Sequence, residues 1–123
     1  MSNLDFSNIN VLAVLTGFLT DFAFTLLVGF LVVSLMTPAG SQQVSPTVEL
    51  IANGLGVVGA LIGGFVAGKI AGRQHVEHGL LASGLGLAIS LCFILPSGQF
   101  TLAFLGFAIL NLVAAGYGGH LSR

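Results

Sequence analysis

Four long apolar stretches, separated by short polar breaks, constrain the fold of this chain more than any other feature. They cover residues 9–36, 48–68, 79–95 and 100–117. A helix needs about 20 apolar residues to cross roughly 30 Å of hydrocarbon, and even the two shorter stretches approach that length. With 55% apolar and only 6% charged residues, the chain also lacks the polar surface of a water-soluble globule. We therefore predict an all-α integral membrane four-helix bundle that forms a single transmembrane domain over residues 1–123.

The breaks between the stretches predict two antiparallel transmembrane hairpins. Residues 37–43 contain a proline, a glycine and two glutamines, which end the first helix. Ser45 followed by a proline is typical of a helix N-cap, and Glu49 suits the positive end of the second helix dipole. We expect residues 69–78 to form the main polar loop. The turn at residues 95–99 is so short that the third and fourth helices must form a hairpin.

The few charged residues predict how the chain is oriented in the membrane. With four spans, both termini and the central loop lie on one side, and that side holds all three basic residues, Lys69, Arg73 and Arg123. The positive-inside rule makes this side cytoplasmic. We therefore predict a protein of a bacterial inner or internal membrane with both termini in the cytoplasm. A net charge of −1 provides no basic surface for nucleic acid, so we expect no such partner.

Small residues recur at every fourth position along the second stretch. One row contains Gly56, Ala60, Gly64 and Gly68, and the neighbouring row contains Gly59 and Gly63. Rows of this kind, called glycine zippers, let helix backbones approach closely, which drives helix packing in lipid. We expect the second helix at the centre of the bundle. Since two rows cover more than one face, this helix is also suited to docking onto another membrane protein.

Asp21 lies inside the first apolar stretch, where a charge costs roughly 2.5–3.5 kcal/mol by insertion scales and marks a candidate functional site. Thr25 follows one helical turn later on the same face. Asn111 lies at a similar depth in the fourth stretch, so we predict a hydrogen bond between Asp21 and Asn111, with the acid protonated if it is at the midplane. Three other readings stay open: an acid at the membrane interface, contact with a partner chain, and proton or ion handling.

The three histidines are all predicted on the cytoplasmic side. His75, His78 and His120 could ligate a metal or the magnesium of a pigment, but a solvated or helix-capping role explains them as well. We predict no bound metal and no bound cofactor. The ten phenylalanines suit lipid, with carotenoid or chlorophyll tails as alternatives. The lone cysteine, Cys92, has no partner for an internal disulfide.

One segment resembles a broad group of small uncharacterised bacterial membrane proteins. The run from Gly63 to Arg73 reads Gly-Gly-Phe-x-Ala-Gly-Lys-x-Ala-Gly-Arg, and a His-Gly pair follows at His78. The same group often carries a Gly-hydrophobic-x-x-Asp element in its first helix, as Gly17 to Asp21 do here. The resemblance covers roughly residues 11–95. It implies a four-span fold and no particular activity.

These features predict a non-catalytic role. The leading hypothesis is an accessory or packing subunit that docks through glycine-rich helix faces onto a larger membrane complex, such as an energy-converting or photosynthetic one. An alternative is a minimal channel or carrier, either monomeric or homo-oligomeric, that uses Asp21. A further alternative is a pigment- or haem-binding subunit. The expected partners are the lipid bilayer and either other membrane subunits or further copies of the chain.

Overall fold

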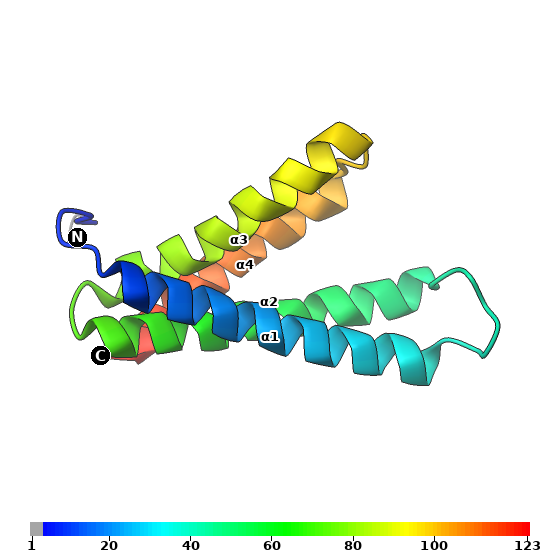
Figure 1. The fold of residues 1–123 in the computed structure, drawn as a ribbon, viewed down its shortest axis with the longest axis horizontal. Coiled ribbons are helices and arrows are strands. Elements are labelled where there is room, and N and C mark those ends of the chain that lie inside the picture. Colours follow the sequence, from blue (N-terminus) through cyan, green and yellow to red (C-terminus); the bar gives the residue numbers. More distant parts are fainter. Residues whose placement is uncertain (1–3) are drawn as a thin grey trace.

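Four helices make up most of the computed structural model, which describes residues 4–123 (Figure 1). They are α1 (Val11–Met36), α2 (Pro46–Ala71), α3 (His75–Ser97) and α4 (Leu102–Leu121). Each is long and apolar enough to cross a membrane, and the described residues contain no strand. The predictions of an all-α fold and four potential spans are therefore confirmed. The first and the last of the described residues lie at the same end of the molecule, which we call the terminal end (Figure 1).

The helices differ from their predicted bounds most clearly at the connection between α2 and α3. We expected a polar loop over residues 69–78, but only residues 72–74 separate the two helices. Gly72 ends α2 in the left-handed conformation, with φ of 67°, which a glycine adopts without steric cost. The polar residues that follow stay helical because they find hydrogen-bond partners elsewhere in the fold. His75 bonds to Ser122, for example, and His78 to Asn10.

The predicted cap of the second helix is present. The Ser45 hydroxyl accepts a hydrogen bond from the Val48 amide at 3.3 Å, and Pro46 occupies the first turn. The short α3–α4 connection reverses at Gly98, whose φ is 69°, and Thr101 caps α4 by accepting from the Phe104 amide at 3.1 Å. These local signals set the ends of both hairpins.

The two hairpins form a wedge. Helix α2 packs against all three other helices, whereas α1 and α4 do not contact each other. The α1–α2 and α3–α4 hairpins lie close together at the terminal end and diverge toward the opposite end, which we call the open end (Figure 1). Helix α2 therefore holds the central position that its rows of small residues predict.

The close contacts of small residues between the two hairpins lie at the terminal end. A Cβ atom on Gly64 or on Gly79 would collide with the Ala115 backbone, and one on Gly118 would collide with the Leu61 carbonyl. Such contacts hold the helix axes close at the terminal end. Toward the open end, a Cβ atom on Gly54 of α2 or on Gly106 of α4 would meet nothing within 4 Å. Close backbone contacts are thus found at the terminal end and not at Gly54 or Gly106, so the two hairpins are held together at one end and diverge at the other.

Candidate functional site

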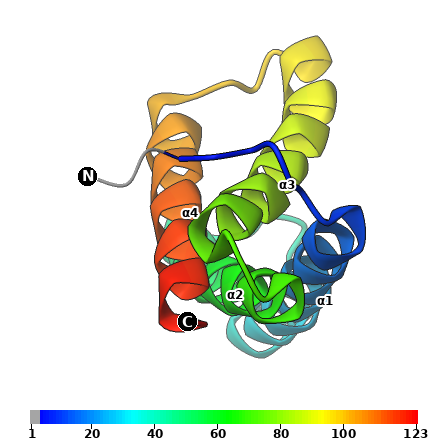
Figure 2. The same cartoon turned by 90° about the vertical axis from the view of Figure 1, so that its left-hand side faces the viewer.

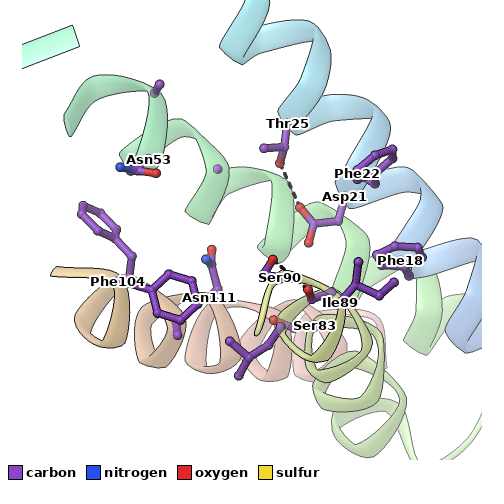
Figure 3. A pocket seen from close by; sticks show the side chains of 16 residues that line it. Phe18, Asp21, Phe22, Thr25, Asn53, Ser83, Ile89, Ser90, Phe104 and Asn111 are labelled. Carbon is purple, nitrogen blue, oxygen red and sulfur yellow. Dashed lines mark hydrogen bonds between the residues drawn. The ribbon is translucent and has the colours of Figure 1, made fainter. Parts of the chain in front are cut away.

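A cavity of about 300 Å³ lies in the wedge between the two hairpins (Figure 3). All four helices contribute to its walls. Its polar lining residues are Asp21 and Thr25 of α1, Asn53 of α2, Ser83 and Ser90 of α3, and Asn111 of α4. Its aromatic lining residues are Phe18, Phe22, Phe104 and Phe107. We refer to this cavity as the cleft.

Asp21 faces the cleft from the middle of its helix. It lies ten residues beyond Val11, or roughly 15 Å along the axis of a 26-residue helix. Its Oδ1 atom accepts a hydrogen bond of 3.1 Å from the Thr25 hydroxyl, one turn later. No donor from residues 4–123 reaches the other carboxyl oxygen. One carboxyl oxygen of Asp21 is therefore hydrogen-bonded within α1, and the other is available to a group in the cleft.

Asn111 lies across the cleft from Asp21 (Figure 3). Its Oδ1 atom is buried and has no hydrogen-bond partner among the described residues. The predicted hydrogen bond between Asp21 and Asn111 is thus not formed. The physical reason is the wedge: α1 and α4 belong to different hairpins and do not touch, so residues at equal depth on them are separated by the cleft.

Three polar lining residues were not predicted as site residues from the sequence. Ser83 is buried and Ser90 is partly buried, and the Ser90 hydroxyl donates to the Gly86 carbonyl at 2.9 Å within its own helix. Asn53 is exposed in α2. An amide inside an apolar stretch is a signal that could have identified Asn53, as it did Asn111. Serines in helices are less informative because they satisfy themselves on the preceding turn.

The aromatic residues give the cleft its apolar part. Phe18 and Phe22 stack with ring centroids 5.8 Å apart, and both rings belong to the α1 wall. Phe104 is on the α4 wall (Figure 3). The cleft thus combines ring faces with one unpartnered carboxyl oxygen of Asp21, and its wall contains the Asn111 amide, whose buried oxygen has no partner among the described residues. This combination suits a hydrogen-bond donor carried on an apolar body.

The candidate histidine ligands lie away from the cleft, at the terminal end. His78 is fully buried, and both its ring nitrogens are hydrogen-bonded within the chain. His75 Nδ1 lies 2.8 Å from the Ser122 hydroxyl, and the His120 ring stacks on Tyr117. Within residues 4–123 no group of three His, Cys, Asp or Glu side chains is placed to hold a metal ion. The structure therefore does not bring these histidines together.

The small residues predicted to pack fall into two groups. Gly63 faces the Gly17 backbone and Gly68 faces Gly119, so both lie in close helix contacts, as Gly64 does. Gly59 lies against the Asp21 and Thr25 side chains. Gly56 differs, because a Cβ there would meet only the Thr25 methyl group at 3.8 Å. Gly56 thus lines the cleft and leaves space in it.

No known protein family matches the chain, and no curated protein or solved structure is significantly similar to it. The resemblance to small four-span bacterial proteins therefore stays a prediction.

Proposed function

We propose that this chain is an integral membrane accessory subunit that receives a transmembrane helix of a partner protein in its cleft. The observation that carries the proposal is the open wedge: Asp21 has one unpartnered carboxyl oxygen at the cleft, and Asn111 in the cleft wall has a buried oxygen without a hydrogen bond. Four apolar helices support the membrane location. The proposal keeps both termini on the cytoplasmic side of a bacterial inner or internal membrane, by the positive-inside rule.

The walls of the cleft suit helix docking in lipid. Association there depends on close backbone approach and on interhelical hydrogen bonds, because apolar side chains gain little by leaving lipid for protein. Small residues line the cleft on three helices: Ala52 and Gly56 on α2, Gly86 on α3 and Ala108 on α4. A helix entering from the open end could therefore approach the backbones of both hairpins.

The unpartnered oxygens indicate the chemistry of the partner. Asn111 Oδ1 and the free oxygen of Asp21 both accept hydrogen bonds, so a complementary helix carries a donor at the same depth. Leaving a buried acceptor unsatisfied costs about 1–3 kcal/mol, and a bound donor would recover that free energy. We infer a partner helix with a hydroxyl, amide or basic side chain near its middle.

Replacing Gly56 by leucine tests this docking mode. The new side chain has room to enter the cleft and would fill the space that the partner needs. We expect at least a tenfold weaker association, or about 1.4 kcal/mol, measured as loss of co-purifying subunits in native mass spectrometry after mild detergent extraction. The matched control is Gly54→Leu, because Gly54 faces open space two residues away.

Two results would contradict the proposal. The first is a wild-type chain that is extracted only as a monomer under the mildest conditions. The second is a partner lost from Gly54→Leu and kept by Gly56→Leu, which would move docking to the outer face of α2. A complex containing only copies of this chain would identify the partner as itself.

A second candidate function is a minimal carrier or channel, either monomeric or homo-oligomeric. It is favoured by one observation, an acid at mid-helix that faces a cavity shared by all four helices. Replacing Asp21 by asparagine keeps the shape of the side chain and its acceptor for Thr25 but removes the ionisable group. If the chain is a carrier, Asp21→Asn should abolish flux in proteoliposomes while the fold survives. If it is a docking subunit, the wild-type chain should show no flux at all.

A pigment- or haem-binding role receives no support from the positions of the histidines. His78 has no free ring nitrogen, and His75 and His120 contact other side chains. A visible absorption band in the purified chain would revive this alternative.

A further inference from the structure

His78 belongs to the first turn of α3, and its ring is fully buried against the segment that precedes α1. The Asn10 backbone amide lies 2.9 Å from Nε2, and the Gln74 backbone carbonyl lies 2.8 Å from Nδ1. An amide N–H can only donate and a carbonyl can only accept. Nε2 must therefore be the bare nitrogen and Nδ1 the protonated one. The geometry assigns His78 a single state, the neutral ring with its proton on Nδ1.

This bond joins parts of the chain that are 68 residues apart. Asn10 is also the N-cap of α1, where its side chain accepts from the Ala13 amide at 3.2 Å. A second hydrogen bond joins the same two parts of the chain: the Asp5 amide donates to Glu77 Oε1 at 3.2 Å. Figure 2 shows this N-terminal segment crossing α3 before it enters α1. Residues 5–10 are thus tied to the first turn of α3 by acceptors on two consecutive side chains.

We propose that His78 is a pH-sensitive latch that holds the N-terminal segment on α3 only while its ring is neutral. A second proton on the ring would occupy Nε2 and face the Asn10 N–H, so two donors would oppose each other across 2.9 Å. The charged ring would also be buried without an acceptor at that nitrogen, which is strongly unfavourable. Proton uptake therefore requires the segment to leave.

The sign of the pH effect follows from proton linkage. The latched state holds one proton on the ring and the released state can hold two. Lowering the pH therefore favours release. Release takes up one proton. The equilibrium constant between the latched and the released state therefore changes tenfold for each pH unit, over the range in which only the released ring carries the second proton. The N-terminal segment is therefore held on α3 at higher pH and released as the pH falls.

No other charged group at the terminal end supplies an acceptor for a second proton on the His78 ring. The N-terminal segment supplies Asp5, α3 supplies His75 and Glu77, the end of α2 and its loop supply Lys69 and Arg73, and the end of the chain supplies His120 and Arg123. Within residues 4–123 none of these side chains hydrogen-bonds the His78 ring. Hydrogen bonds from Ser7 lower the pKa of Asp5, so Asp5 keeps its charge throughout the range in which histidine titrates.

Nuclear magnetic resonance on the full chain in detergent micelles tests the latch. At about pH 8 the ¹⁵N shifts of His78 should show a protonated Nδ1 and a bare Nε2, and the Asn10 amide should be protected from hydrogen exchange. Between about pH 7 and about pH 5 the protection factor, corrected for the intrinsic exchange rate, should fall roughly tenfold per pH unit. A protonated Nε2 at high pH, or protection that does not depend on pH, would overturn the proposal.

Two variants locate the effect. His78→Gln offers an amide oxygen that can accept from Asn10 but does not titrate, so any protection that remains should no longer depend on pH. His120→Gln removes an exposed histidine of α4 and should leave the pH response of wild type unchanged. A pH response that persists in His78→Gln, or one that disappears in His120→Gln, would assign the switch to another group. His78→Gln with an intact fold and no protection at any pH would also support the latch, because the glutamine oxygen then fails to replace the ring nitrogen as the acceptor for Asn10.

Discussion

Replacing Gly64 by valine should separate α2 from α4 and lower the free energy of unfolding by about 3 kcal/mol. A Cβ atom at this position would overlap the Ala115 backbone, and a backbone cannot move aside as the end of a flexible side chain can. Because Gly79 of α3 meets the same Ala115 carbonyl, a displaced α4 also disturbs α3. The measurement is equilibrium unfolding in mixed micelles, followed by circular dichroism.

Gly54→Val is the matched control for this prediction. It introduces the same β-branched side chain in the same helix, but a Cβ at Gly54 meets nothing within 4 Å. Its effect should stay within about 0.5 kcal/mol, the difference in helix propensity. Equal destabilisation by both variants would show that valine acts through the helix itself, and the close α2–α4 contact would not be the source of stability.

Replacing Asn111 by leucine should stabilise the isolated chain while weakening its association with a partner. The Asn111 carbonyl oxygen is buried without a hydrogen bond, and removing such a group relieves about 1–3 kcal/mol. The same oxygen is one of the two acceptors that we assign to a partner donor. A substitution that raises stability but weakens binding is typical of a residue that is kept for function. A residue that serves only the fold would lower stability when replaced. Unfolding in micelles and native mass spectrometry measure the two quantities.

Asn53→Leu provides the comparison for stability. Asn53 also lines the cleft, but its side chain is exposed, so its surroundings change little on unfolding. We expect little change in the free energy of unfolding. If Asn111→Leu destabilised the chain instead, its amide would have a partner in the folded state, and the cleft would offer only Asp21 as an acceptor. If Asn111→Leu bound partners as wild type does, the donor would have to reach Asp21 alone.

Much of the fold could be predicted because its determinants are local. Apolar length predicts the four helices, Ser45 and its proline predict the start of α2, and small residues predict its central position. The α2–α3 connection was predicted too long because charged and imidazole side chains resemble a loop when their partners are unknown. Glu77 and His78 are helical, since distant backbone amides at Asp5 and Asn10 satisfy them.

The candidate site was predicted in its parts but not in its geometry. Asp21 and Asn111 are both conspicuous as polar groups in apolar stretches, and their similar depth suggested a direct bond. Depth along a helix says nothing about the angle between hairpins. That angle depends on which small residues meet, and the close contacts of Gly64 and Gly118 lie at one end only.

The sequence alone thus determined what can be read from composition and spacing: four helices long and apolar enough to span a membrane, two hairpins and a polar group within α1. These depend on hydrophobic length and on turn residues, which act over a few positions. Only the tertiary structure decided that the hairpins diverge, that Asp21 and Asn111 face a shared cleft, and that His78 bonds to Asn10. Each of these depends on contacts between residues far apart in the chain, because backbone distance and side-chain partners are fixed only when the helices pack.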